Sequence, residues 1–288
     1  MKLLFLPENH WKERAAAHRL RLEPLVTPAL ARSGRHEKHP VYDFLFTYYS
    51  FPPAALLRWS PGPGVVLTGE SAVPLMAGRK GYTPVEGGVV LKPFPAARKP
   101  YLNWAAEYLE TMLNRSPQFG CLGLHEWAMV YQGTEVRHGA VPLRLSGQAL
   151  NAFVEGQSLA CTHYDAYRFF TAAARPRNLL GLSRASTTHS DQRGCVHVNM
   201  DLYRFCYKIY PWVEGECLAE AFELAAAARE VDMMASPYDL REYGFAPICL
   251  ETGDGQLEYI RRQRQLSEAA QPIRRKVLTA YRRLLTEG

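Results

Sequence analysis

The chain has 288 residues, of which 47% are apolar, and its formal net charge is +6 at pH 7. This composition excludes a disordered chain, because enough apolar side chains are present to form a substantial core. A charge of this size allows nucleic-acid binding without requiring it, since many basic enzymes bind only small anions.

The amino-terminal segment predicts an amphipathic helix over residues 8–23, with Asn9 as its cap and with Pro24 and Pro28 interrupting it. The apolar run before Pro7 is too short for a signal peptide, and no run of about 18 apolar residues occurs anywhere. We therefore expect a cytoplasmic protein with no membrane partner. The six cysteines include no C-x-x-C pair, so reduced thiols are expected.

Residues 38–64 are rich in aromatic side chains and end in a cluster of prolines. Short apolar runs bounded by glycines follow, at Gly64–Gly69 and Gly87–Leu91, and they are typical of a small β-ribbon. The segment of about 64–92 is therefore predicted to be a β-prone insertion in, or beside, a mostly helical fold.

The rest of the chain favours helices. Apolar residues recur with helical spacing over 101–115, and residues 217–234 form an alanine-rich helical segment. A basic helical tail is predicted over about 256–288, with Pro272 as a kink or a break. These elements predict a mainly α protein, a single globular helical domain over residues 1–288 with a small β-ribbon element.

Three motifs place a histidine beside a carboxylate and among aromatic rings: LHEWAMVY (124–131), CTHYDAYRFF (161–170) and GCVHVNMDLYRF (194–205). In the third motif His197 and Asp201 are four residues apart, so they share one face of a helix. That spacing suits two metal ligands, or a histidine whose tautomer is fixed by a carboxylate.

In the second motif His163 and Asp165 are two residues apart, which points them to different sides of a regular helix. They serve one site only if His163 lies at the helix entrance, for which Thr162 is a reasonable cap. The first motif begins like the zinc-protease sequence H-E-x-x-H, but Met129 stands at the second ligand position. His125 and Glu126 remain separate candidates for one site residue each.

A single histidine on an apolar helix is typically a core or capping residue, and most of the neighbouring rings are expected to be core. Three such motifs together predict a shared polar pocket, because burying charge is costly unless the charge is paired. Glu230 and Asp232 are further candidates for this pocket, although a capping or structural role is favoured for Asp232.

The predicted carboxy-terminal helix is rich in basic residues. Together with the amino-terminal helix it is a candidate anion-binding face. Its residues are Arg261, Arg262, Arg264, Arg274, Arg275, Lys276, Arg282 and Arg283, with Arg14, Arg19 and Arg21. Near the second motif, Arg168, Arg175 and Arg177 are either phosphate contacts or solvated side chains. No P-loop, G-x-G-x-x-G or G-x-S-x-G pattern is present, which argues against nucleotide kinases, dinucleotide oxidoreductases and α/β serine hydrolases.

Five strings carry a resemblance to a known family: YDFLFTYYS, FGCLGLHEWAMVY, THYDAYRFFT, GCVHVNMDLYRF and EVDMMASPYDL. From about Lys38 to Arg275 the chain resembles a bacterial family labelled 3-methyladenine DNA glycosylase. The resemblance implies a DNA-repair hydrolase that excises alkylated bases and needs no cofactor, with DNA as its partner. The helix-hairpin-helix loop of the well-studied alkylbase glycosylases is not identified in this sequence.

In such a glycosylase a carboxylate stabilises the oxocarbenium-like sugar and orients water, while rings hold the extracted base. The resemblance implies Asp165 or Asp201 as the carboxylate and His163 or His197 as the residue that positions water. The remaining residues of the implied substrate site would bind the base and a phosphate: Trp127, Tyr164, Phe169 and Arg168.

Two alternatives remain open. The first is a metal-dependent helical enzyme that oxygenates or hydrolyses a small molecule with one or two iron, manganese or zinc ions. Its candidate ligands are His125, His163, His197, Asp165 and Asp201, with Glu126. The second alternative is a non-catalytic nucleic-acid-binding protein, in which the same motifs would be structural.

Overall fold

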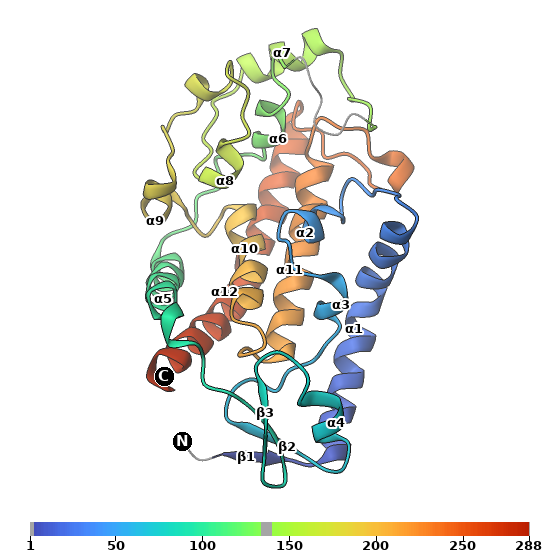
Figure 1. Cartoon of the computed structure of the whole chain (residues 1–288). Coiled ribbons are helices and arrows are strands. Elements are labelled where there is room, and N and C mark those ends of the chain that lie inside the picture. The colour runs from blue at the N-terminus through green and yellow to red at the C-terminus, as the bar shows by residue number, and fades with distance from the viewer. Residues whose placement is uncertain (1–2, 134–139, 288) are drawn as a thin grey trace. The chain divides into compact units, whose positions relative to one another are not determined.

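The computed structural model describes residues 3–133 and 140–287. Most of these residues are helical, and the strands belong to one small sheet (Figure 1). The prediction of a mainly α protein with a small β element is therefore confirmed.

The α-helices differ widely in length, from single turns to one of 35 residues. They are α1 Glu8–Gly34, α2 Phe44–Thr47, α3 Pro53–Leu56, α4 Ala72–Met76, α5 Lys99–Asn114, α6 His125–Ala128, α7 Gly147–Glu155, α8 Tyr164–Tyr167, α9 Thr187–Ser190, α10 Val196–Lys208, α11 Gly215–Met234 and α12 Gly253–Glu287. The short 3-10 helices are η1 Ala96–Arg98, η2 Arg175–Arg177, η3 Arg184–Ser186 and η4 Arg241–Tyr243. The strands are β1 Leu4–Leu6, β2 Val65–Thr68, β3 Tyr82–Val85 and β4 Gly88–Leu91.

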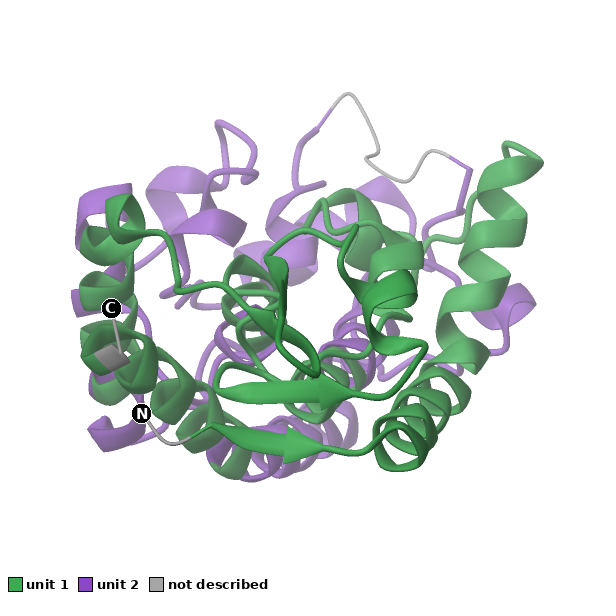
Figure 2. Cartoon of the chain, turned by 60° about the horizontal axis from the view of Figure 1, so that its bottom comes forward, with its two compact units in different colours: residues 1–110, 202–223, 272–288 green, residues 111–201, 224–271 purple. Residues whose placement is uncertain are grey.

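The chain forms two compact units, each assembled from segments that are far apart in the sequence (Figure 2). Unit 1 contains residues 1–110, 202–223 and 272–288. Unit 2 contains residues 111–201 and 224–271. The unit boundaries fall inside helices α5, α10, α11 and α12.

The sheet belongs to unit 1 and has the strand order β1-β2-β4-β3. Strand β1 is parallel to β2, whereas β4 is antiparallel to both of its neighbours. The predicted β-prone segment supplies β2 to β4, but β1 has only three residues and gave no recognisable pattern. Gly88 is required at its position, because a Cβ atom there would lie 2.1 Å from the carbonyl oxygen of Leu67.

Helix α1 continues to Gly34, through Pro24 and Pro28, which were predicted to interrupt it. Pro24 and Pro28 lie on the exposed side of the helix, whereas Leu22 and Val26 on the same helix are fully buried. Burial of this apolar face stabilises the helix against the local cost of the prolines. Helix α12 likewise runs through Pro272 without a break in its helical assignment.

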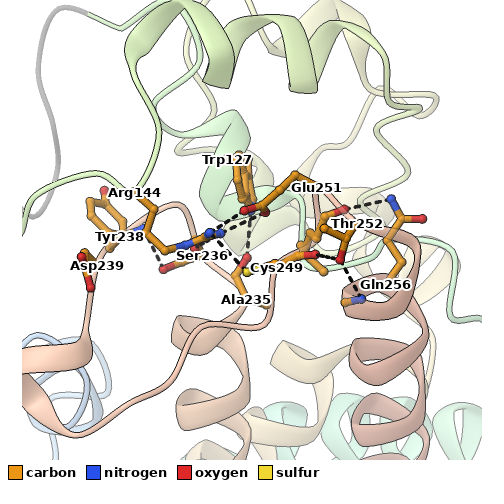
Figure 3. A network of polar contacts seen from close by, with 12 residues as sticks. Trp127, Arg144, Ala235, Ser236, Tyr238, Asp239, Cys249, Glu251, Thr252 and Gln256 are labelled. Atoms are coloured by element: carbon orange, nitrogen blue, oxygen red, sulfur yellow. Dashed lines mark hydrogen bonds and ion pairs between the residues drawn. The ribbon is translucent and has the colours of Figure 1, made fainter.

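A polar network lies beneath α6 and around the end of α11 in unit 2 (Figure 3). Both terminal nitrogens of Arg144 bind the Glu251 carboxylate, at 2.5 and 3.1 Å, and the guanidinium lies 5.6 Å from the centre of the Trp127 ring. The Trp127 indole is fully buried and donates a hydrogen bond to the Ala235 carbonyl oxygen. This network fixes α6 against the loop that follows α11.

All six cysteines are free thiols. Among the described residues, no helix is both long enough and apolar enough to cross a membrane.

Candidate metal centre

A tight turn in unit 2 determines where α6 begins. Leu122 and Gly123 both have a left-handed backbone, with φ values of 47° and 65°. A Cβ atom at position 123 would come within 2.9 Å of the Tyr259 ring, so glycine allows the turn to pack directly against α12. The turn brings the chain to His125, the first residue of α6.

His125 meets His197 of α10 and Asp232 of α11. The Nε2 atom of His125 lies 2.6 Å from Oδ1 of Asp232, and Nε2 of His197 lies 3.9 Å from Oδ2 of the same carboxylate. The two imidazole rings are 4.4 Å apart in an edge-on arrangement. One potential ligand atom from each of the three residues lies within 4.8 Å of the other two, an arrangement that can hold a metal ion.

Arg229 and Glu126 surround this triad. Nη1 of Arg229 donates to Oδ2 of Asp232 at 2.7 Å and to Oε1 of Glu126 at 2.9 Å. Arg229 is 1% exposed and Glu126 is 4% exposed, so both charges are in the protein interior. The second carboxylate oxygen of Glu126, Oε2, is buried and has no hydrogen-bond partner among the described residues.

The surroundings of the cluster shift the pKa values of His197 and Asp232. Burial, reinforced by His125, holds the pKa of His197 well below its usual value, so the ring is neutral and keeps a free lone pair. Burial opposes ionisation of Asp232, but the hydrogen bond with His125 and the Arg229 guanidinium outweigh it and lower the pKa of this carboxyl group. The charge of Arg229 is permanent, so its effect does not depend on the state of the histidines.

His163 extends the cluster on the other side of His197. The two imidazole rings are stacked, with centres 5.3 Å apart and planes 3° from parallel. Nδ1 of His163 lies 3.1 Å from Oδ1 of Asp191, and its Nε2 lies 3.8 Å from Oδ2 of Asp201. All these groups except His197 are at most 4% exposed. The three histidines of the sequence motifs thus meet in the interior of unit 2.

The local structure around His163 agrees with the geometry that the sequence required. His163 itself occupies the position before α8, with an extended backbone, one residue later than the predicted cap Thr162. Asp201 follows His197 by one turn of α10, so both face the same cluster. Asp165 lies in the first turn of α8, with its Oδ1 atom 3.4 Å from Nε of Arg168.

The residues that were predicted to bind a base differ in exposure. Trp127 is fully buried, as expected of a core residue. Tyr164 and Phe169 are half-buried, and the exposed Arg168 lies over the Phe169 ring at 4.1 Å. Within the second motif, Tyr164, Tyr167 and Phe169 are therefore the rings that border solvent.

Most cations of the predicted basic face have an acidic partner in their own unit. The following lie 2.5–2.9 Å from a carboxylate oxygen: Arg14, Arg19, Arg21, Arg261, Arg262, Lys276 and Arg282. Arg274 is completely buried. Arg264 and Arg275 are exposed and form no ion pair within residues 3–133 and 140–287. The face is therefore less positive than the sequence indicates.

Two members of the cluster were not predicted from the sequence. Asp191 lies in an irregular segment, where no spacing rule relates it to a histidine 28 positions earlier. Arg229 had a recognisable signal, because it is a lone cation within an alanine-rich apolar helix, three residues before Asp232. A buried guanidinium requires carboxylate partners, and this requirement points to Glu126 and Asp232.

Comparison with known proteins gives no similarity on which to base a function: no protein-family model, no curated protein and no solved structure matches the chain. The functional argument therefore depends on the geometry of the cluster.

Proposed function

We propose that His125, His197 and Asp232 bind a divalent transition metal, and that the protein is a metal-dependent enzyme acting on a small molecule. The observation that carries the proposal is the convergence of two imidazoles and one carboxylate from three separate helices, with ligand atoms within 4.8 Å of one another. Two histidines and one carboxylate are the ligand set of non-haem iron(II) oxygenases and of several zinc hydrolases.

The charge balance of the cluster supports a cation at this place. Glu126 and Asp232 are both at most 4% exposed, and the same nitrogen of the buried Arg229 guanidinium, Nη1, donates a hydrogen bond to each of them. An excess of buried negative charge is unfavourable, and a dication would reduce it. The unpartnered Oε2 atom of Glu126 is consistent with the same need.

The surrounding residues have definable tasks in such a centre. A bound metal would supply Lewis-acid or oxygen chemistry at the positions that three protein ligands leave open. His125 would bind the metal through a ring nitrogen that carries no proton. Arg229 would hold the Asp232 carboxylate in one orientation, and His163 would fix the ring plane of His197 by stacking. His197, whose side chain is 12% exposed, is the member of the triad nearest to solvent.

Metal content tests this proposal. Protein that is purified without chelators and reconstituted anaerobically with iron(II), manganese(II) or zinc(II) should contain about one equivalent of one of these metals. His197→Ala should weaken the affinity by more than about 100-fold, because loss of an outer partner alone costs about 10–100-fold. Elemental analysis and competition with a chelator of known affinity measure both quantities.

His189→Ala is the matched control, because His189 is exposed and lies on the neighbouring helix α9. Its metal content should equal that of the wild type. Less than about 0.1 equivalent in reconstituted, folded wild-type protein would remove the metal proposal.

A second candidate function is the excision of alkylated bases from DNA. The observation that favours it is the pair formed by His163 and Asp201, at 3.8 Å. The resemblance implies these two residue types as the water-positioning group and the carboxylate. In this alternative Asp201 would stabilise the developing positive charge on the sugar and His163 would orient water.

The two functions differ in their response to a chelator. A glycosylase of this kind should release free 3-methyladenine from methylated DNA in the presence of EDTA, and Asp201→Asn should abolish the release. Chromatography of the released bases measures the activity against a heat-denatured control. If no base appears above that control, with or without added metal, the glycosylase alternative is excluded.

A further inference from the structure

A cavity of about 330 Å³ lies in unit 2 and shares no residue with the histidine cluster. It is open to solvent on one side and is bordered by the loop before α6, the loop before α10 and the middle of α12. Its principal lining residues are Phe119, Arg193, Arg264, Ser267, Glu268 and Gln271. The volume is within the range of small-molecule sites, and it exceeds what a free inorganic anion would fill.

Hydrogen bonds hold two walls of the cavity together. The side chain of Gln192 is buried, and its Oε1 atom accepts from the amides of Gln118, at 2.8 Å, and Gly194, at 2.6 Å. Glycine is needed at 194, because a Cβ atom there would lie 2.3 Å from the carbonyl oxygen of Gln118. The cavity is therefore a fixed feature of the packing between two loops.

Helix α12, which forms the third wall of the cavity, is hydrogen-bonded to the loop before α10. Ser267 of α12 donates a hydrogen bond to the carbonyl oxygen of Arg193 at 3.0 Å. Nη1 of Arg193 in turn donates to the carbonyl oxygen of Leu113 at 3.1 Å, which anchors the guanidinium. Arg193 is therefore a pre-positioned cation.

Two polar atoms of the lining residues lack partners among the described residues. Nε of Arg193 is a buried donor and Oε1 of Gln271 is a buried acceptor, and neither has a hydrogen bond. A buried polar group without a partner is destabilising, so both atoms favour a ligand that presents an acceptor to one and a donor to the other.

The remaining lining residues add charge and an aromatic surface. Arg264 is exposed, and its guanidinium lies 5.4 Å from the centre of the Phe119 ring. A guanidinium stacked on an aromatic ring keeps its in-plane donors available for an anion. Glu268, at the exposed edge of the cavity, can accept a hydrogen bond from a ligand hydroxyl or amine.

We propose that this cavity binds a small molecule in which a flat ring carries an anionic group. Arg193 and Arg264 bind the anion, and Phe119 contacts the ring. Gln271 accepts a hydrogen bond from a donor on the ligand. Mononucleotides and aromatic carboxylates share this chemistry, and the two sources can be separated by experiment. The inference does not depend on the function of the histidine cluster.

Titration calorimetry on the full chain at low salt tests the proposal with four probes: adenosine 5′-monophosphate, 1-naphthoate, adenosine and inorganic phosphate. Adenosine 5′-monophosphate or 1-naphthoate should bind at least about 10-fold more tightly than adenosine and inorganic phosphate. Only the first two compounds combine a flat ring with an anionic group. The tighter of the two identifies the source of the ligand. If neither binds, or if phosphate binds as tightly as the ring-bearing anions, the proposal is wrong.

Variants locate the binding. Arg264→Gln should weaken binding of the better probe by about 10-fold or more, as expected for loss of a charge-assisted hydrogen bond. Gln271→Ala should weaken it less and should leave the fold intact. Arg261→Gln is the matched control, because Arg261 is on the same helix, is exposed and pairs with Glu258. Equal binding by all three variants would place the ligand elsewhere and overturn the proposal.

Discussion

Replacement of Arg229 by methionine should lower the free energy of unfolding by about 3–5 kcal/mol, which is typical when one partner of a buried ion pair is removed. Nη1 of Arg229 binds both Glu126 and Asp232, and all three residues are at most 4% exposed. Methionine has a similar volume, so the expected loss comes from two carboxylates left without their guanidinium rather than from a cavity. Urea denaturation followed by circular dichroism measures the change.

Two further variants separate the electrostatic explanation from a packing effect. Arg241→Met removes an exposed guanidinium from Asp239, and it should cost less than about 1 kcal/mol. Combining Arg229→Met with Glu126→Gln should recover part of the lost stability, since one of the two unpaired charges is then absent. If Arg229→Met costs no more than the Arg241 variant, the buried network does not stabilise the fold.

Addition of the preferred metal should stabilise the wild-type protein by about 2.7 kcal/mol when the free metal concentration is 100 times Kd. Asp232→Asn should lose this gain completely, because the variant removes the charged ligand that lies between the two histidines. The quantity to compare is the shift that metal produces in each protein relative to the same protein without metal. Thermal unfolding at several metal concentrations provides it.

Asp239→Asn serves as the control for this experiment. Asp239 lies shortly after the end of α11, the helix that carries Asp232. Its ion pair is with Arg241 at the surface. This variant should retain the full metal-dependent gain. An undiminished gain in Asp232→Asn would mean that metal stabilises the protein from another site.

The sequence was sufficient to predict the mainly α fold and the meeting of the three motifs. Helical spacing works within one element, and so it related His197 to Asp201 correctly. The cost of burying charge then argued that His125, His163 and His197 belong together, and the ring contacts agree. These inferences needed only local periodicity and one energetic rule.

The rest depended on contacts that no local pattern reveals. Asp191 reaches His163 from a loop, where sequence separation carries no directional information. An aromatic residue in an apolar segment gives the same signal whether it is core or a ligand platform, and Trp127 is core. The continuation of α1 through Pro24 and Pro28 depended on tertiary burial, which outweighs local propensity.

Residues 191–197 of unit 2 contact both the histidine cluster and the cavity. Asp191 contacts His163, Gln192 joins the two loops of the cavity, and Arg193 lines that cavity. His197, the second residue of α10, belongs to the triad. Insertion or deletion of a single residue here would displace either Gln192 from its amide partners or His197 from the triad, because the two ends of the segment are held by different contacts. Natural or engineered length variation should therefore be absent between positions 191 and 197, even though much of this segment lies in a loop.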